Sequence, residues 1–150
     1  MSIQSSASLK RLNHLQCEMS AVYHEMSLSV GQSDSVIQIL YTICDSGGES
    51  CLLHDICNLT GLPKQTINSS IRKLQADGYL TLSPGKGRSM HIHLTASGKK
   101  LIQEKLLPLI QIENDTLASF SPEECEQLLR LNAKYNQTLR SRLSNLEEDL

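Results

Sequence analysis

The stretch from 54 to 95 restricts the fold of this 150-residue chain more than any other part. Its first segment, HDICNLTG, has helical spacing and is expected to turn Ile56 and Leu59 inward. A turn at Gly61–Pro63 follows, and the proline suits the first turn of a new helix because it has no N–H to leave unpaired. The new helix has a predicted buried face of three apolar residues spaced i, i+4 and i+7, namely Ile67, Ile71 and Leu74.

Two short strands are predicted after this second helix. Gly78 stops the helix, and Tyr79–Leu82 then alternates as a strand would. The turn-rich run SPGKGRS separates it from a second strand, HIHLT, at 91–95, so the two form a hairpin. A short helix, a tight turn, a second helix and a hairpin make a winged helix-turn-helix. The expected fold class is therefore mostly α-helical, with a small β-hairpin as the wing.

Basic side chains concentrate in this part of the chain. The formal net charge of the whole chain is only −2, from 14 Lys+Arg against 16 Asp+Glu. Residues 61–100 nevertheless hold seven bases and one acid, a balance of +6, whereas the rest holds seven bases and fifteen acids, a balance of −8. Because salt screens distant charges, a local basic block attracts an anionic partner even on an acidic chain. The charge pattern thus favours an anionic partner, and the winged helix-turn-helix indicates that this partner is double-stranded DNA.

The outward face of the second helix carries side chains that suit base and phosphate contacts. Asn and Gln pair with adenine and Arg with guanine in the major groove, while Lys, Ser and Thr also contact phosphates. In the hairpin turn, glycines permit close approach to DNA, and a narrow minor groove attracts an inserted Arg. The predicted DNA-binding residues are Lys64, Gln65, Thr66, Asn68, Ser69, Arg72 and Lys73 of the helix and Lys86 and Arg88 of the hairpin.

Helical patterns flank the winged segment, which is expected over 34–94, on both sides. A first helix with a nearly heptad apolar stripe is expected within 8–30. Residues 96–150 should hold a helix that Pro108 kinks and a last helix that opens with the capping box SPEE at 121–124. One winged core cannot bury all of this apolar surface, so the chain is expected to be a single domain, 1–150, that dimerises through these flanking helices. A two-fold dimer would set two recognition helices about one DNA turn (~34 Å) apart.

The chain resembles the MarR (multiple antibiotic resistance regulator) family of transcriptional regulators over nearly its whole length. The resemblance rests on LPKQTINSSIRKLQADGYL, on LTASG at 94–98, which is similar to an LTxxG motif before a long helix, and on the SPEE helix. It implies a triangular homodimer on a pseudo-palindromic operator. It also places Gln65, Thr66, Asn68 and Ser69 at the recognition-helix contacts and Arg88 at the wing tip.

Two residues depart from the family pattern, and both bear on DNA contacts. Lys86 stands where the family wing usually has an aspartate that braces the arginine, so the wing should be more basic. Ser69 stands where the family has an arginine, so the family's base preference does not transfer. The resemblance further implies a repressor that responds to a small molecule, of unknown identity, in a pocket near Met26, Ile37 and Tyr41.

The residues also bear on three other functions. An oxidant-responsive regulator would use Cys17, which shares a helix face with His14 and His24, while Cys44, Cys51 and Cys57 are expected to be core residues. A winged-helix module that binds proteins without operator specificity is the alternative from another class. Enzymatic motifs are missing from the sequence, so no catalytic residue is assigned.

No cofactor, metal or membrane partner is predicted. His14 and His24 lie about 15 Å apart along one helix, too far to share a metal ion, and the His91/His93 pair has no converging ligands in the sequence pattern. The chain has no run of the ~20 apolar residues that a membrane span needs, and its first residues lack the apolar core of a signal peptide. A cytoplasmic location is therefore expected.

Overall fold

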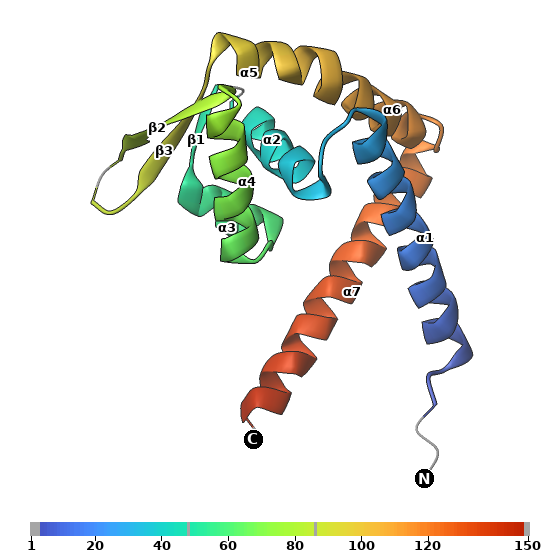
Figure 1. Ribbon diagram of the computed structural model, residues 1–150. Helices are drawn as coiled ribbons and strands as arrows, with labels where there is room; N and C mark the ends of the chain where they lie inside the picture. The colour runs from blue at the N-terminus through green and yellow to red at the C-terminus, as the bar shows by residue number, and fades with distance from the viewer. Residues whose placement is uncertain (1–3, 48, 86, 149–150) are drawn as a thin grey trace. The chain divides into compact units, whose positions relative to one another are not determined.

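The computed structural model describes residues 4–47, 49–85 and 87–148, and these form two compact units, 1–109 and 110–150 (Figure 1). The first unit begins with the long helix α1 and contains the predicted winged segment. Its elements are α1 (Ala7–Ser29), α2 (Asp34–Asp45), β1 (Ser50–Leu52), α3 (Leu53–Thr60), α4 (Lys64–Ala76), β2 (Leu80–Pro84), β3 (Met90–Leu94), α5 (Ala96–Leu101) and the π-helical turn η1 (Ile102–Leu106). Helix α6 (Leu107–Ala118) runs from the first unit into the second, which also holds α7 (Pro122–Glu148).

The core of the first unit lies where α2, α3, α4 and the sheet meet. Each of these elements contributes side chains with at most 1% of their surface exposed, and all are aliphatic. This explains how a chain with 3% aromatic residues fills its interior. These side chains are Val36, Ile39, Leu40, Ile43, Ile56, Ile67, Leu74, Leu80 and Ile92.

The wing is a three-stranded antiparallel sheet in the order β1-β3-β2. The predicted hairpin is confirmed, with Leu82 opposite Ile92, and the short β1 adds an edge strand in which Cys51 faces Ile92. Figure 1 shows the β2–β3 hairpin projecting beyond the helices α2, α3 and α4. The sheet thus anchors the hairpin at its base.

Local capping contacts set several helix boundaries, including the one predicted at SPEE. The Ser33 hydroxyl accepts a hydrogen bond from the Val36 amide at the start of α2, and Thr95 caps α5 through the Gly98 amide. The capping box of α7 is complete: the Glu124 amide donates to Ser121 Oγ and the Ser121 amide donates to the Glu124 carboxylate. These contacts join residues only three positions apart, which is why the sequence reveals them.

One expectation about packing needs correction. Ile56 is fully buried, as expected, but Leu59 is 69% exposed. Helix α3 has only eight residues, and Leu59 lies in its last turn, just before the turn at Gly61, where the helix no longer packs against the core. Just before Pro108, where a kink is expected, the helix contains the π-helical turn η1. Proline cannot donate to the preceding turn, and a π turn is one way for a helix to accommodate that loss. Among the described residues, no helix is both long and apolar enough to span a membrane.

Candidate nucleic-acid interface

Helix α4 is set at an angle to α3 by a three-residue turn. Gly61 ends α3 with a φ of 64°, a left-handed conformation that favours glycine. The Thr60 hydroxyl donates to the Ile56 carbonyl at 2.6 Å and accepts from the Leu62 amide at 3.3 Å, which holds the turn on both sides. Pro63 then precedes the first helical residue, Lys64. The turn therefore fixes the direction in which α4 leaves the core.

The two faces of α4 differ as the sequence predicts. Ile67, Ile71 and Leu74 are between 0% and 3% exposed and pack into the core. All seven residues predicted to contact DNA lie on the remaining surface. Of these, Thr66 and Asn68 are half-buried, and the exposed ones are Lys64, Gln65, Ser69, Arg72 and Lys73.

Two open grooves run along the outward surface of α4. One is lined by Lys64, Gln65, Asn68, Ser69 and Arg72, all from α4. The other lies between α4 and α2 and includes Gln65, Ser69 and Lys73. Because Gln65 and Ser69 line both grooves, they form a ridge between them, which we call the recognition ridge. A ridge of amide and hydroxyl groups flanked by bases has the chemistry that reads a DNA major groove.

The wing carries one described base at its turn. Arg88 is exposed, and the turn is closed by a 2.7 Å hydrogen bond from the Gly85 amide to the Ser89 carbonyl. Lys86, the other predicted wing contact, lies outside the described residues. On the outer face of the sheet, the rings of His91 and His93 stack with centroids 5.8 Å apart. The structure thus places Arg88 on a projecting loop.

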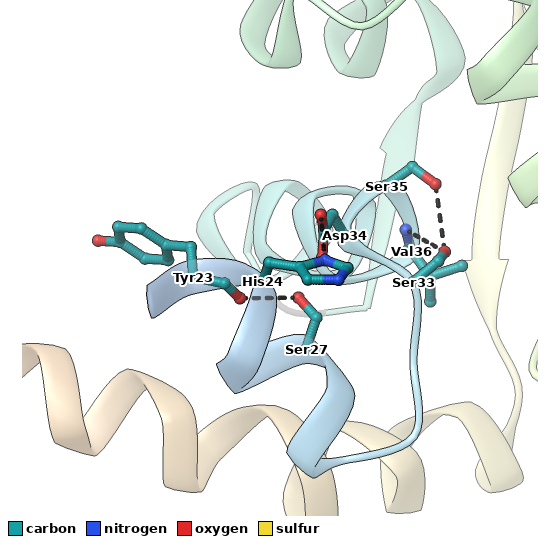
Figure 2. Close-up of polar contacts among 7 residues, drawn as sticks. All are labelled: Tyr23, His24, Ser27, Ser33, Asp34, Ser35 and Val36. Atoms are coloured by element: carbon teal, nitrogen blue, oxygen red, sulfur yellow. Dashed lines mark hydrogen bonds and ion pairs between the residues drawn. The ribbon is translucent and has the colours of Figure 1, made fainter. Parts of the chain in front are cut away.

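A polar junction joins α1 to the start of α2 (Figure 2). His24 Nδ1 donates a hydrogen bond to the Asp34 carboxylate and lies 3.1 Å from Oδ1 and 2.9 Å from Oδ2. This hydrogen bond, with a smaller contribution from Ser27, holds the pKa of Asp34 below its ordinary value of 3.8. The sequence did not predict this pair, because its members are ten residues apart and meet only when α1 and α2 pack.

Replacing His24 by glutamine is expected to raise the pKa of Asp34 toward 3.8, which a carbon-detected NMR titration of the carboxyl group measures. Because the pKa of Asp34 is lowered on folding, the pair stabilises the folded state fully when the pH is above the ordinary pKa. This stabilisation is lost as the pH falls through the lowered pKa. Since the side chains are 57% and 51% exposed, the contribution is below about 1 kcal/mol. His14→Gln on the same helix is the control, and an unchanged Asp34 pKa in His24→Gln would refute the pairing.

The residues suggested for sensing are distributed over α1 and α2. Ile37 is buried, whereas Met26 and Tyr41 are half-buried, and a ligand role for these three stays a prediction. Cys17 is exposed on α1. Burial raises the pKa of Cys51 to about 11, with a smaller contribution from Asp55, and burial also raises the pKa of Cys44, so both thiols are poor nucleophiles. Within the described ranges, no three His, Cys, Asp or Glu side chains converge on a common point.

Comparison with known proteins agrees with this geometry. Residues 31–89 match the profile of the MarR family. A MarR family regulator from Neisseria meningitidis has 18% sequence identity and a TM-score of 0.82, covering 93% of this chain and 99% of its own. S. aureus MepR, solved in a complex with DNA, has 19% identity and a TM-score of 0.65, covering 93% and 98%.

A third similar structure is that of a protein whose DNA binding is regulated by 6-hydroxynicotinic acid. This is BpsR of Bordetella bronchiseptica, with 21% identity and a TM-score of 0.66, covering 84% of this chain and 98% of its own. No curated protein matches the chain in sequence. The structural likeness therefore establishes the fold.

Proposed function

We propose that this chain, which carries the winged helix fold of the MarR family of transcriptional regulators, is a sequence-specific DNA-binding regulator. The observation that supports this most strongly is the outward surface of α4. It gathers an amide-bearing ridge, two flanking grooves and three bases on a helix whose other face is fixed in the core. A helix held in this way can enter the major groove with its side chains already oriented.

Dimerisation is the second part of the proposal. Helix α7 leaves a row of apolar side chains between 38% and 57% exposed, and α1 leaves another that includes Leu15, Met19 and Val22. Exposed apolar rows on two long helices favour burial against a second copy of the chain. The row on α7 consists of Leu128, Leu131, Tyr135, Leu139, Leu143 and Leu146.

In this proposal the regulator is a cytoplasmic repressor. Its affinity for a pseudo-palindromic operator changes when a small molecule binds near Met26, Ile37 and Tyr41. Support comes from the fold and from BpsR, whose DNA binding responds to a small aromatic acid.

The test is to incubate the dimer with a random-sequence duplex library, enrich the bound molecules over several rounds, and measure affinity for the enriched duplex at a series of salt concentrations. A specific reader should yield one enriched sequence family and lose affinity steeply as salt rises, because each neutralised phosphate releases counterions. Equal affinity for all sequences, or no binding at low salt, would instead support the protein-interaction module.

Asn68→Ala is expected to weaken binding to the enriched duplex by about 1–3 kcal/mol and to relax preference at one base pair. Asn68 lines the groove beside the recognition ridge, where its amide can make two hydrogen bonds to an adenine. Affinities for all single-base variants of the duplex measure both effects. Gln75→Ala, at an exposed position near the end of the same helix, is the control. Unchanged affinity and preference in Asn68→Ala would show that the reading face is misassigned.

Arg88→Ala is expected to weaken binding to most duplexes and to reduce the slope of log affinity against log salt by about one. Arg88 is exposed on the projecting turn and would meet a phosphate or a narrow minor groove there. Fluorescence anisotropy at four or more salt concentrations gives the slope. Arg140→Ala on α7 removes the same charge elsewhere and should leave the slope unchanged. An unaltered slope in Arg88→Ala would place the wing away from DNA.

A further inference from the structure

The groove between α2 and α4 has a lining that the α4 contacts alone do not explain. It is built from side chains of both helices, and none of the residues lining it is acidic. Its one charged residue is Lys73, and hydroxyl groups supply most of its other polar atoms. The hydroxyl-bearing residues are Ser33, Ser35, Thr66, Ser69 and Ser70. A lysine beside clustered hydroxyls, without acids, has the chemistry of an anion site.

Three of the serines are hydrogen-bonded to one another across the two helices. Ser35 Oγ lies 2.8 Å from Ser70 Oγ and 3.2 Å from Ser33 Oγ. Ser33 also accepts from the Val36 amide. The three hydroxyl groups have three protons, and the two hydrogen bonds among the serines use two of them. Ser70 is 92% buried, whereas Ser33 is exposed. When Ser70 donates to Ser35 and Ser35 donates to Ser33, the hydroxyl proton of Ser33 is left available for a partner outside this serine cluster.

Asp34 lies between Ser33 and Ser35 in the sequence but does not line the groove. Its carboxylate is held by His24 of α1, and Figure 2 shows this pair beside, and separate from, the Ser33–Ser35 contact. The α1–α2 junction thus keeps the nearest acid engaged elsewhere. Lys73 is therefore the one charged side chain that lines the groove, although α2 begins with an acidic residue.

The position of the groove identifies the anion. If the recognition ridge enters a major groove about 12 Å wide, a DNA backbone runs along each side of α4. On one side the backbone meets the groove of Lys64 and Arg72, and on the other it meets the α2–α4 groove. Small serine side chains on α2 leave room for a sugar–phosphate chain to approach.

We infer that the α2–α4 groove is a second DNA contact, in which Ser33, Ser35 and Lys73 bind a phosphate of the backbone beside the recognition helix. The inference rests on the proposed DNA binding and extends the interface to α2, which the sequence did not mark. Phosphate contacts of this kind position a recognition helix and carry no base preference. They also add to the salt dependence of binding.

A matched pair of substitutions at Ser33 tests the site. Aspartate and asparagine have nearly the same size and both cap helices well, so Ser33→Asp and Ser33→Asn should keep α2 folded and differ only in charge. The probe is a fluorescent mixed-sequence duplex of about 30 base pairs, long enough for two half-sites one turn apart. At low salt, Ser33→Asp should bind the duplex about tenfold or more weakly than Ser33→Asn does. The difference in affinity between the two variants should become smaller as salt screens the repulsion between the aspartate and the phosphate.

Two further controls separate the site from general charge effects. Ser121→Asp adds the same charge at the N-terminal cap of α7 and should leave affinity unchanged. Lys73→Gln should reduce the salt slope by about one, whereas Lys105→Gln, an exposed lysine on η1, should not. Circular dichroism melts confirm that each variant is folded.

The outcomes distinguish this inference from the proposed function. If the unchanged protein binds DNA and Ser33→Asp equals Ser33→Asn, the phosphate site is refuted while DNA binding stands. The same holds if Lys73→Gln and Lys105→Gln have equal slopes. If the unchanged protein binds no duplex at low salt, both the proposed function and the phosphate site are overturned.

Discussion

Replacing Leu139 and Leu143 together by glutamate is expected to convert the proposed dimer into monomers and to weaken operator binding by about 100-fold or more. The two leucines are 55% and 54% exposed on α7 and lie one turn apart in its apolar row. Burying two carboxylates in a dimer interface is prohibitive without partners. A monomer then loses the gain in affinity that comes from engaging two half-sites at once. Sedimentation velocity gives the mass, which should fall to that of one chain, 16.7 kDa.

The matched control for this double variant is Gln137→Glu with Ser141→Glu. These positions have the same spacing on the same helix but point to its opposite face, where both residues line a polar surface groove. They therefore introduce the same charges and the same small cost in helix stability. The control should remain dimeric. Equal behaviour of the two double variants, whether both dimeric or both monomeric, would contradict an interface on the leucine row.

Gly98→Ala is expected to destabilise the fold by about 2–4 kcal/mol and to lower the melting temperature by roughly 5–15 °C. Gly98 is buried in the first turn of α5, where an added Cβ would overlap the Tyr79 carbonyl oxygen and lie 3.1 Å from Leu94 Cδ2. The overlapped atom is backbone and cannot rotate away. That carbonyl also accepts the Thr95 amide at 3.1 Å, so moving it would disrupt the link between β2 and α5.

Whether Gly98→Ala stabilises or destabilises the fold tests this close contact, because alanine is a better helix former than glycine by up to about 1 kcal/mol. An unhindered Gly98→Ala would therefore stabilise α5. Ser97→Ala, at the exposed neighbouring position, should change stability by no more than about 0.5 kcal/mol. Calorimetric melts of the two variants make the comparison. Stabilisation by Gly98→Ala would show that α5 does not approach the Tyr79 carbonyl as closely as described.

Features that depend on neighbours in sequence were predicted well. The cap at Ser121, which the SPEE motif predicts, joins residues three positions apart. The buried face of α4 follows from helical periodicity alone, and it determines which side chains point outward. The order of helices, turn and hairpin then specified the winged architecture. Local signals were sufficient because each of these features is set within one or two turns of chain.

Features that depend on packing between elements were not predicted. The Ser35–Ser70 hydrogen bond joins residues 35 positions apart, and the His24–Asp34 pair needs α1 and α2 to meet. No periodicity marks such pairs, although the cluster of Ser33, Asp34 and Ser35 at a helix start was visible. The exposure of Leu59 was missed for the same reason, since it depends on where the α3 surface ends.

Hydroxyl-radical footprinting on the enriched duplex tests the central claim most directly. The proposal predicts two protected backbone segments related by two-fold symmetry, with centres about one helical turn (10–10.5 base pairs) apart, and additional protection where the wings reach. Asn68→Ala should reduce protection in both segments equally. A single protected segment, or uniform weak protection along the duplex, would contradict a dimer that reads an operator with two recognition helices.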